Sequence, residues 1–144
     1  MLHDITIEET GNSVFGKALK FGTGTDKYMS LENYINTGTG QTSFSMWYKY
    51  DTSITETNTN ASAVLLQHED KGNRSGRTLL SLKSDGKYDT FINGERAAVT
   101  EKAVQKGDWQ HITVVFDQEA KTVKYYINGE LDGTAKTIGN SATD

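Results

Sequence analysis

Apolar residues recur at every second position along two neighbouring stretches near the C-terminal end of the chain, residues 110–116 and 122–127. An alternation of period two predicts half-buried β-strands, because successive side chains of a strand point to opposite faces of a sheet. Residues 117–121 are polar and predict a short loop, and Asn128 with Gly129 favours a tight type I′ turn. The pattern therefore predicts an antiparallel meander with core positions Ile112, Val114, Phe116, Val123, Tyr125 and Ile127.

Shorter stretches of the same kind occur along the rest of the chain. They predict further strands at residues 14–21, 28–31, 42–50, 63–67, 77–83 and 88–92. The polar stretches between them predict loops at residues 33–41, 51–61 and 68–76. Residues 1–13 are interpreted as a lead-in or a weak edge strand, and residues 97–106 as either a short helix or an irregular strand. An all-β fold class follows.

The composition fits one domain rich in turns. The chain has 144 residues, of which 35% are hydrophobic and 14 are glycine, which is enough for one core and too little for two comfortable domains. We therefore expect a single domain over residues 1–144. No stretch approaches the roughly eighteen apolar residues of a membrane-spanning helix, so we expect no membrane insertion. No signal peptide precedes Ile5, and we expect Met1 to begin an excised piece of a longer protein.

Charge and cysteine content exclude several classes of function. The 15 basic and 19 acidic residues give a net charge of −4 and form no blocks. Because nucleic-acid-binding proteins carry a basic patch or stripe, we expect no nucleic acid partner. The chain has no cysteine, which excludes thiol catalysis, disulfides and thiolate metal sites and leaves the cellular compartment open.

Five stretches carry a resemblance to a known family: GKALKFGTGTDKYMSL, FSMWYK, LLSLKSDGKYDTFING, GDWQHITVVFD and KYYINGELDGT. Over residues 14–137 the chain resembles laminin-G-like domains of the concanavalin A-like lectin/glucanase superfamily, in the form common as an accessory module of bacterial secreted proteins. The resemblance implies a two-sheet antiparallel jelly-roll sandwich and a place in a larger secreted or cell-surface protein.

The C-terminal end departs from the family pattern. Members continue past the Asn-Gly hairpin through two more strands, the last of which pairs beside the first, so we expect either that this fold is closed differently or that the sandwich lacks its last strands. The edge of the strand around residues 18–21 then needs a partner, because an unpaired edge is a template for another strand. A homodimer, a separate strand-completing segment, or the chain's own residues 1–13 or 134–144 would supply it. Ile5 and Ile7, which have the period of a half-buried strand, favour self-coverage.

Neither the carboxylates nor the histidines form a catalytic pattern. Glycoside hydrolases that share this sandwich carry Glu-x-Asp-x-x-Glu on one strand, because the acid and the nucleophile must project from one face about 5 Å apart. Adjacent pairs such as Glu8 with Glu9 point to opposite faces of a strand instead. The histidines are scattered, without metal spacing or a nucleophile partner. We expect no enzymatic activity.

A charged, glycine-containing loop is the predicted ligand-binding rim. Residues 68–77 follow one apolar strand and precede another, and their guanidinium groups suit a carboxylate or vicinal hydroxyls of a glycan. A plain solvent loop is the alternative. The residues of this rim, three of which lie on the neighbouring hairpin, are His68, Glu69, Asp70, Arg74, Arg77, Asp85, Tyr88 and Arg96.

Two further sites are weaker candidates. The alternation along residues 42–50 leaves open which face of that strand is buried. Trp47, His111 and Tyr126 lie opposite the apolar sets of their strands, so if those sets fill the core they would face outward and stack on a sugar ring. Similar residues at matching positions in the family imply a scaffold role, which we favour. Asp26, with the carbonyl groups of the glycines before it, resembles half of the structural calcium site of such sandwiches, and an ordinary turn is the alternative. Calcium is the expected cofactor if there is one.

These expectations combine into two main hypotheses on function, and a catalytic domain with an unrecognised site is a third, weaker one. The first is a non-catalytic, lectin-like carbohydrate-binding module with a glycan as partner. The second is a protein-interaction or spacer domain of a bacterial adhesin or a phage tail protein.

Overall fold

A computed structural model of residues 1–144 describes the backbone of residues 2–3, 5–11, 14, 16–22, 27–30, 40–50, 62–70, 73–83, 85–92, 95–97 and 99–139. The side chains of residues 2–3, 62–63, 68–70, 73–78, 95–97, 136 and 139 lie outside this description. In the described ranges the regular elements are β-strands, which confirms the predicted all-β class. None of these residues belongs to a helix with the length and apolarity that a membrane crossing requires. The chain divides into two units, Met1–Ile35 and Asn36–Asp144, and a single domain over residues 1–144 stays a prediction.

The first unit contains two antiparallel strand pairs. Strand β1 (Leu2–His3) pairs with β4 (Tyr28–Met29). Strand β2 (Thr6–Glu9) pairs with β3 (Lys17–Lys20), so one edge of the strand expected at residues 18–21 is covered by a segment of the chain's own N-terminal part, as self-coverage predicts. The half-buried state expected of this strand is wrong, because all four residues of β2 are exposed, Ile7 to 60%.

Deleting residues 1–12 is expected to remove the hydrogen-bond partners of β3 and to speed amide exchange there. Hydrogen–deuterium exchange on peptides that cover Lys17–Lys20 measures this effect. Peptides from Trp109–Asp117, a strand of the second unit, serve as the control and should keep their protection. Equal protection of Lys17–Lys20 in both chains would show that β2 does not hold β3 in solution.

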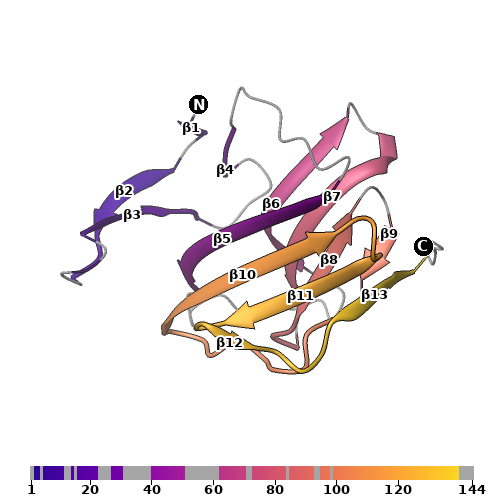
Figure 1. The fold of residues 1–144 in the computed structure, drawn as a ribbon. Helices are drawn as coiled ribbons and strands as arrows, with labels where there is room; N and C mark the ends of the chain where they lie inside the picture. The colour runs from indigo at the N-terminus through magenta and orange to yellow at the C-terminus, as the bar shows by residue number, and fades with distance from the viewer. Residues whose placement is uncertain are drawn as a thin grey trace. The chain divides into compact units, whose positions relative to one another are not determined.

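The second unit is one antiparallel sheet that folds over on itself into two layers. Along the sheet the order is β5-β10-β11-β13-β9-β8-β7-β6. Strand β12 pairs with Tyr126 and Ile127 at the end of β11, beyond the residues that pair with β13. In Figure 1, β5, β10 and β11 lie in front of β6, β7 and β8. The strands are β5 (Gln41–Lys49), β6 (Ser62–Asp70), β7 (Asn73–Lys83), β8 (Tyr88–Ile92), β9 (Glu95–Ala97), β10 (Trp109–Asp117), β11 (Thr122–Ile127), β12 (Glu130–Leu131) and β13 (Lys136–Gly139).

Strand β13 joins the two layers at one side. Thr137 pairs with Thr122 of β11, and Ile138 pairs with Ala97 of β9. The segment 134–144 was one of the expected covers for the strand at residues 18–21. Its described part pairs within the second unit instead, so this version of the prediction is wrong for residues 136–139.

The predicted meander is confirmed. Strand β10 runs antiparallel to β11 and β5, so that Ile112 lies opposite both Ile127 and Met46. All six expected core positions of β10 and β11 are buried. The turn after β11 has positive φ at Asn128 (52°) and at Gly129 (84°), as a type I′ turn requires.

The core lies between the two layers. The rings of Tyr48 on β5 and Tyr88 on β8 meet edge to face with centroids 6.0 Å apart, and their hydroxyls share a hydrogen bond. Thr90 and Tyr125 share a second buried hydroxyl contact between β8 and β11. The face of β5 that points inward therefore carries Phe44, Met46 and Tyr48, a choice that the alternation along residues 42–50 left open.

The structure corrects the predicted loop at residues 68–76. Strand β6 continues to Asp70 and β7 begins at Asn73, and these two residues pair directly. Register shifts between Val64 and Leu66 and between His68 and Asp70 mark irregularities in β6, which are typical of the edge strand that β6 forms in this sheet. Charged residues remain in a strand here because cross-strand backbone hydrogen bonds do not depend on side-chain polarity.

Two predicted connections remain, residues 51–61 and 97–106, and the structure describes most of the second but none of the first. Loop 51–61 lies outside the described residues. Of residues 97–106, Ala97 ends β9 and the described positions 99–106 form no helix or strand. That segment is therefore an irregular connection between the two layers.

Candidate functional site

The predicted rim does not come together as one site. Arg77 lies in β7 six residues before Lys83, where the strand ends, and Asp85 lies in the turn beyond. At about 3.3 Å per residue, roughly 20 Å of strand separates Arg77 from that turn. The charged segment 68–77 and Asp85 thus lie toward opposite ends of β7, which corrects the expected grouping.

Six rim residues lie in strands and have side chains outside the description. His68, Glu69 and Asp70 end β6, and Arg74 and Arg77 lie in β7. The backbone of Arg96 in β9 pairs with Phe91 and Gly139, and its side chain is likewise outside the description. Their ligand-binding role stays a prediction.

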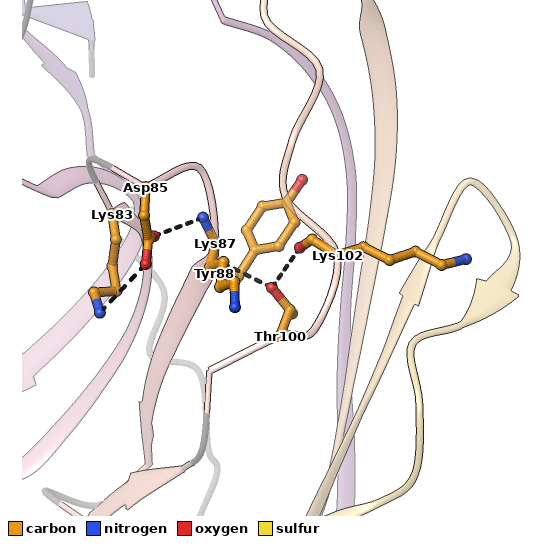
Figure 2. Close-up of polar contacts among 6 residues, drawn as sticks. All are labelled: Lys83, Asp85, Lys87, Tyr88, Thr100 and Lys102. Carbon is orange, nitrogen blue, oxygen red and sulfur yellow. Dashed lines mark hydrogen bonds and ion pairs between the residues drawn. The ribbon is translucent and has the colours of Figure 1, made fainter.

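Asp85 stabilises a turn. Its carboxylate Oδ1 accepts the backbone N–H of Lys87 at 3.0 Å, and its Oδ2 lies 3.9 Å from Nζ of Lys83 (Figure 2). Both oxygens of this exposed carboxylate therefore have partners within the β7–β8 hairpin. An aspartate that bonds the backbone two residues ahead is a common turn-former.

Tyr88 belongs to the core rather than to a rim. Its side chain has no exposed surface, and burial raises the pKa of its hydroxyl to about 12. Its backbone N–H donates to Oγ1 of Thr100 at 3.0 Å, and this hydroxyl donates in turn to the carbonyl of Lys102 at 2.9 Å (Figure 2). The expectation that Tyr88 touches a ligand is corrected, because the opposite layer covers its ring.

The side of β5, β10 and β11 that faces away from the core carries a group of aromatic, hydroxyl and lysine side chains, which we call the outer aromatic face. Period two places them there, because their strand neighbours fill the core. Cross-strand pairing sets Trp47 opposite His111 and Ser45 opposite Thr113. The members are Ser45, Trp47, Lys49, Trp109, His111, Thr113, Lys124 and Tyr126.

Trp47 and His111 form the centre of this face. Their ring centroids lie 4.9 Å apart with the planes tilted by 47°, and the Trp47 side chain is 49% exposed. Oγ of Ser45 lies 2.7 Å from Nε2 of His111 and 3.1 Å from Oγ1 of Thr113. The outward positions predicted for Trp47, His111 and Tyr126 are confirmed, whereas Ser45 and Thr113 were missed as partners, since only cross-strand register brings them beside the histidine.

The β11–β12 turn holds the backbone of this centre. The His111 N–H donates to Oδ1 of Asn128 at 2.9 Å, and the Asn128 N–H donates to the His111 carbonyl at 2.8 Å. The turn is thus tied to β10 by two hydrogen bonds. These two hydrogen bonds fix the position of the His111 backbone, from which the imidazole projects onto the outer aromatic face.

Asp117 lies at one end of the outer face and is already engaged. Its carboxylate accepts the backbone N–H of Ala120 at 2.8 Å and Nε2 of Gln41 at 2.9 Å. The Ala120 hydrogen bond, followed by the Gln41 one, lowers the pKa of this carboxyl group. Asp117 is therefore a charged, loop-stabilising residue at the edge of the face.

A buried carboxylate, Asp132, was missed by the sequence interpretation. It has no exposed surface, and its two oxygens accept the backbone N–H groups of Glu101 at 2.6 Å and Lys102 at 2.9 Å. These contacts fasten the irregular segment 99–108 to the end of β12. The Asp-Gly pair at residues 132–133 was the only signal, and it predicts a turn rather than a long-range anchor.

The calcium hypothesis remains a prediction. Asp26 lies outside the described residues. Within the described ranges no group of three or more His, Asp or Glu side chains is placed to hold a metal ion.

Comparison with protein families bears on the fold and on the class of function. No curated protein matches the chain. A laminin-G-type family model, described as concanavalin A-like lectin/glucanases superfamily, matches residues 23–144, which is most of the chain. Domains of this superfamily often bind carbohydrates or mediate interactions, and the superfamily also includes glycosidases. With the antiparallel two-layer arrangement of the strands, this match confirms the resemblance seen in the sequence, and the chain belongs to the concanavalin A-like lectin/glucanase superfamily.

Proposed function

We propose that the chain is a non-catalytic carbohydrate-binding module whose ligand lies on the outer aromatic face. The observation that carries this proposal is the half-exposed Trp47 ring beside His111, with the hydroxyls of Ser45 and Thr113 next to them. An aromatic ring covers the apolar C–H face of a sugar, and hydroxyl and imidazole groups exchange hydrogen bonds with its hydroxyls. Membership of a superfamily whose domains often bind carbohydrates supports the same choice.

Catalysis is not part of the proposal. Glycosidases use two carboxyl groups about 5 to 10 Å apart. On the described outer face of β5, β10 and β11, Asp117 is the single carboxylate. It already accepts hydrogen bonds from Gln41 Nε2 and from the Ala120 backbone N–H. A module that binds without cleaving fits this arrangement, and we place it, as a proposal, in a larger secreted or cell-surface protein with a glycan as partner.

Replacing Trp47 by alanine is expected to weaken saccharide binding by about 2 kcal/mol, roughly 30-fold, the effect of removing a central aromatic contact. Isothermal calorimetry against a panel of neutral and acidic oligosaccharides measures this change. Because the ring is half-exposed, the urea midpoint of unfolding should shift little.

Two control variants make this experiment specific. Trp47→Phe keeps an aromatic ring and should retain part of the affinity. Val64→Ala removes a side chain on β6 that is 52% exposed and lies outside the outer aromatic face, so it should bind like the parent. Equal affinities of the parent and Trp47→Ala for every saccharide that binds would refute the proposed site.

A further inference from the structure

The outer aromatic face carries the same pair of side chains twice. Each pair is an aromatic residue with a lysine two positions away on the same strand: Trp47 with Lys49 on β5, and Tyr126 with Lys124 on β11. Residues two apart on a strand share one face. All four side chains therefore belong to the outer face, because the residues between them, Tyr48 and Tyr125, point into the core.

The register fixes how these two pairs are arranged. Strands β5 and β11 both run antiparallel to β10, so they are parallel to each other. Trp47 lies opposite His111, and Tyr126 lies opposite Thr113, one step further along β10 on the same face. With strands about 4.8 Å apart and about 6.7 Å between same-face residues, the two aromatic residues are roughly 12 Å apart.

The lysines lie outside the two aromatic residues. Lys49 is opposite Trp109, and Lys124 is opposite Val115, so three same-face steps along β10 separate their levels. Their backbones are therefore roughly 22 Å apart by the same spacings. The order along this diagonal is lysine, ring, ring, lysine, with the hydroxyl and imidazole groups of Ser45, Thr113 and His111 in the middle.

The charge of this face differs from that of the chain as a whole. The chain carries a net charge of −4, yet the described outer face of β5, β10 and β11 has two lysines against Asp117 alone. Asp117 already accepts hydrogen bonds from Gln41 and Ala120, and Lys124 acts on it at longer range. Neither Lys49 nor Lys124 makes an ion pair with an acidic side chain that the structure describes. The face is thus locally cationic and complements an anionic ligand.

We propose that the ligand is a linear oligosaccharide of uronic acids that lies diagonally across β5, β10 and β11. This inference rests on the proposed function. Trp47 and Tyr126 each stack on one sugar ring, and Lys49 and Lys124 each bind a carboxylate. A uronic acid fits because it carries one carboxylate attached to the ring itself, which matches one lysine next to one aromatic platform. The span between the lysines requires a chain longer than a disaccharide.

Calorimetry with a pair of matched ligands tests this proposal. An oligogalacturonate hexasaccharide carries the carboxylates, and its methyl ester has the same backbone without charge. We expect the acid to bind, the methyl ester to bind at least several-fold more weakly, and affinity for the acid to rise from the disaccharide to the hexasaccharide. Added salt should weaken binding of the acid and leave that of the ester nearly unchanged.

Three variants assign the effect to the lysines. Lys49→Gln and Lys124→Gln should each weaken binding of the acid by about two- to five-fold, the range of exposed ion pairs, and leave binding of the methyl ester unchanged. Lys87→Gln removes the same charge from the β7–β8 turn, away from the face, and should have no effect.

The outcomes separate this inference from the proposed function. If the ester binds as tightly as the acid and Trp47→Ala abolishes both, the uronic-acid ligand is wrong and the carbohydrate-binding function stands. If a linear oligosaccharide with sulfate groups in place of carboxylates binds more tightly, and the lysine variants weaken it, the uronic-acid assignment is likewise overturned. If no saccharide shows binding that depends on Trp47, the proposed function itself falls.

Discussion

Replacing Asp132 by alanine is expected to lower the free energy of unfolding by roughly 3 to 5 kcal/mol. The carboxylate is fully buried and accepts two backbone N–H groups, those of Glu101 and Lys102. Hydrogen bonds to a charged group contribute about 1.5 to 3 kcal/mol each, and their loss leaves two donors without an acceptor. Urea unfolding followed by tryptophan fluorescence measures the change, because both tryptophans lie in the second unit.

A conservative variant and a distant variant complete this experiment. Asp132→Asn keeps one acceptor oxygen and should cost about half as much. Asp108→Ala removes an exposed carboxylate from the same irregular segment and should change stability by less than about 0.5 kcal/mol. If the Asp132 and Asp108 variants unfolded at the same urea concentration, the buried anchor would be disproved.

The local backbone restricts which residue can follow this anchor. Gly133 has φ of +67°, a conformation that side chains rarely adopt, and a Cβ atom at this position would collide with the carboxylate of Glu101. The glycine thus lets the chain turn sharply while Asp132 reaches the neighbouring segment. The 132–133 turn therefore stabilises the fold by holding segment 99–108.

Replacing Tyr88 by alanine is expected to destabilise the protein by roughly 3 to 5 kcal/mol, as other large-to-small changes of buried aromatic residues do. The ring is fully buried between the layers, and its hydroxyl bonds that of Tyr48. Tyr88→Phe should cost about 1 kcal/mol, because it keeps the packing and removes one hydrogen bond. Chemical denaturation of both variants gives these values.

A comparison with Tyr126 distinguishes a core role from a binding role. Tyr126 is partly exposed on the outer aromatic face. Tyr126→Ala should cost less stability than Tyr88→Ala and should weaken saccharide binding, whereas Tyr88→Phe should bind like the parent. Weaker saccharide binding by a fully folded Tyr88→Phe variant would return Tyr88 to the list of ligand contacts.

Elements with a strong local pattern were predicted correctly. Strands β10 and β11 follow from the alternation along residues 110–116 and 122–127, and the turn after them follows from Asn128-Gly129. Both signals are readable in the sequence because side-chain period and turn conformation depend only on neighbouring residues. The family resemblance added the two-layer architecture, which periodicity does not contain. The loop predicted at residues 68–76 was wrong, because the polar residues of this segment resemble those of a loop. Its strand pairing depends instead on backbone hydrogen bonds to a partner strand.

The candidate site depends on pairings that no local pattern encodes. Alternation along the sequence puts His111 and Tyr126 opposite the apolar sets of their strands. For Trp47 the outward side was decided by the packing of Phe44, Met46 and Tyr48 against the core. The neighbourhood of Ser45 and His111, 66 positions apart, exists because β5 and β10 pair in one register, and a shift of one residue would turn every side chain to the other face. In the same way, the burial of Tyr88 and Asp132 follows from packing against segments far along the chain, since burial is a property of the assembled layers and not of a residue's neighbours in sequence.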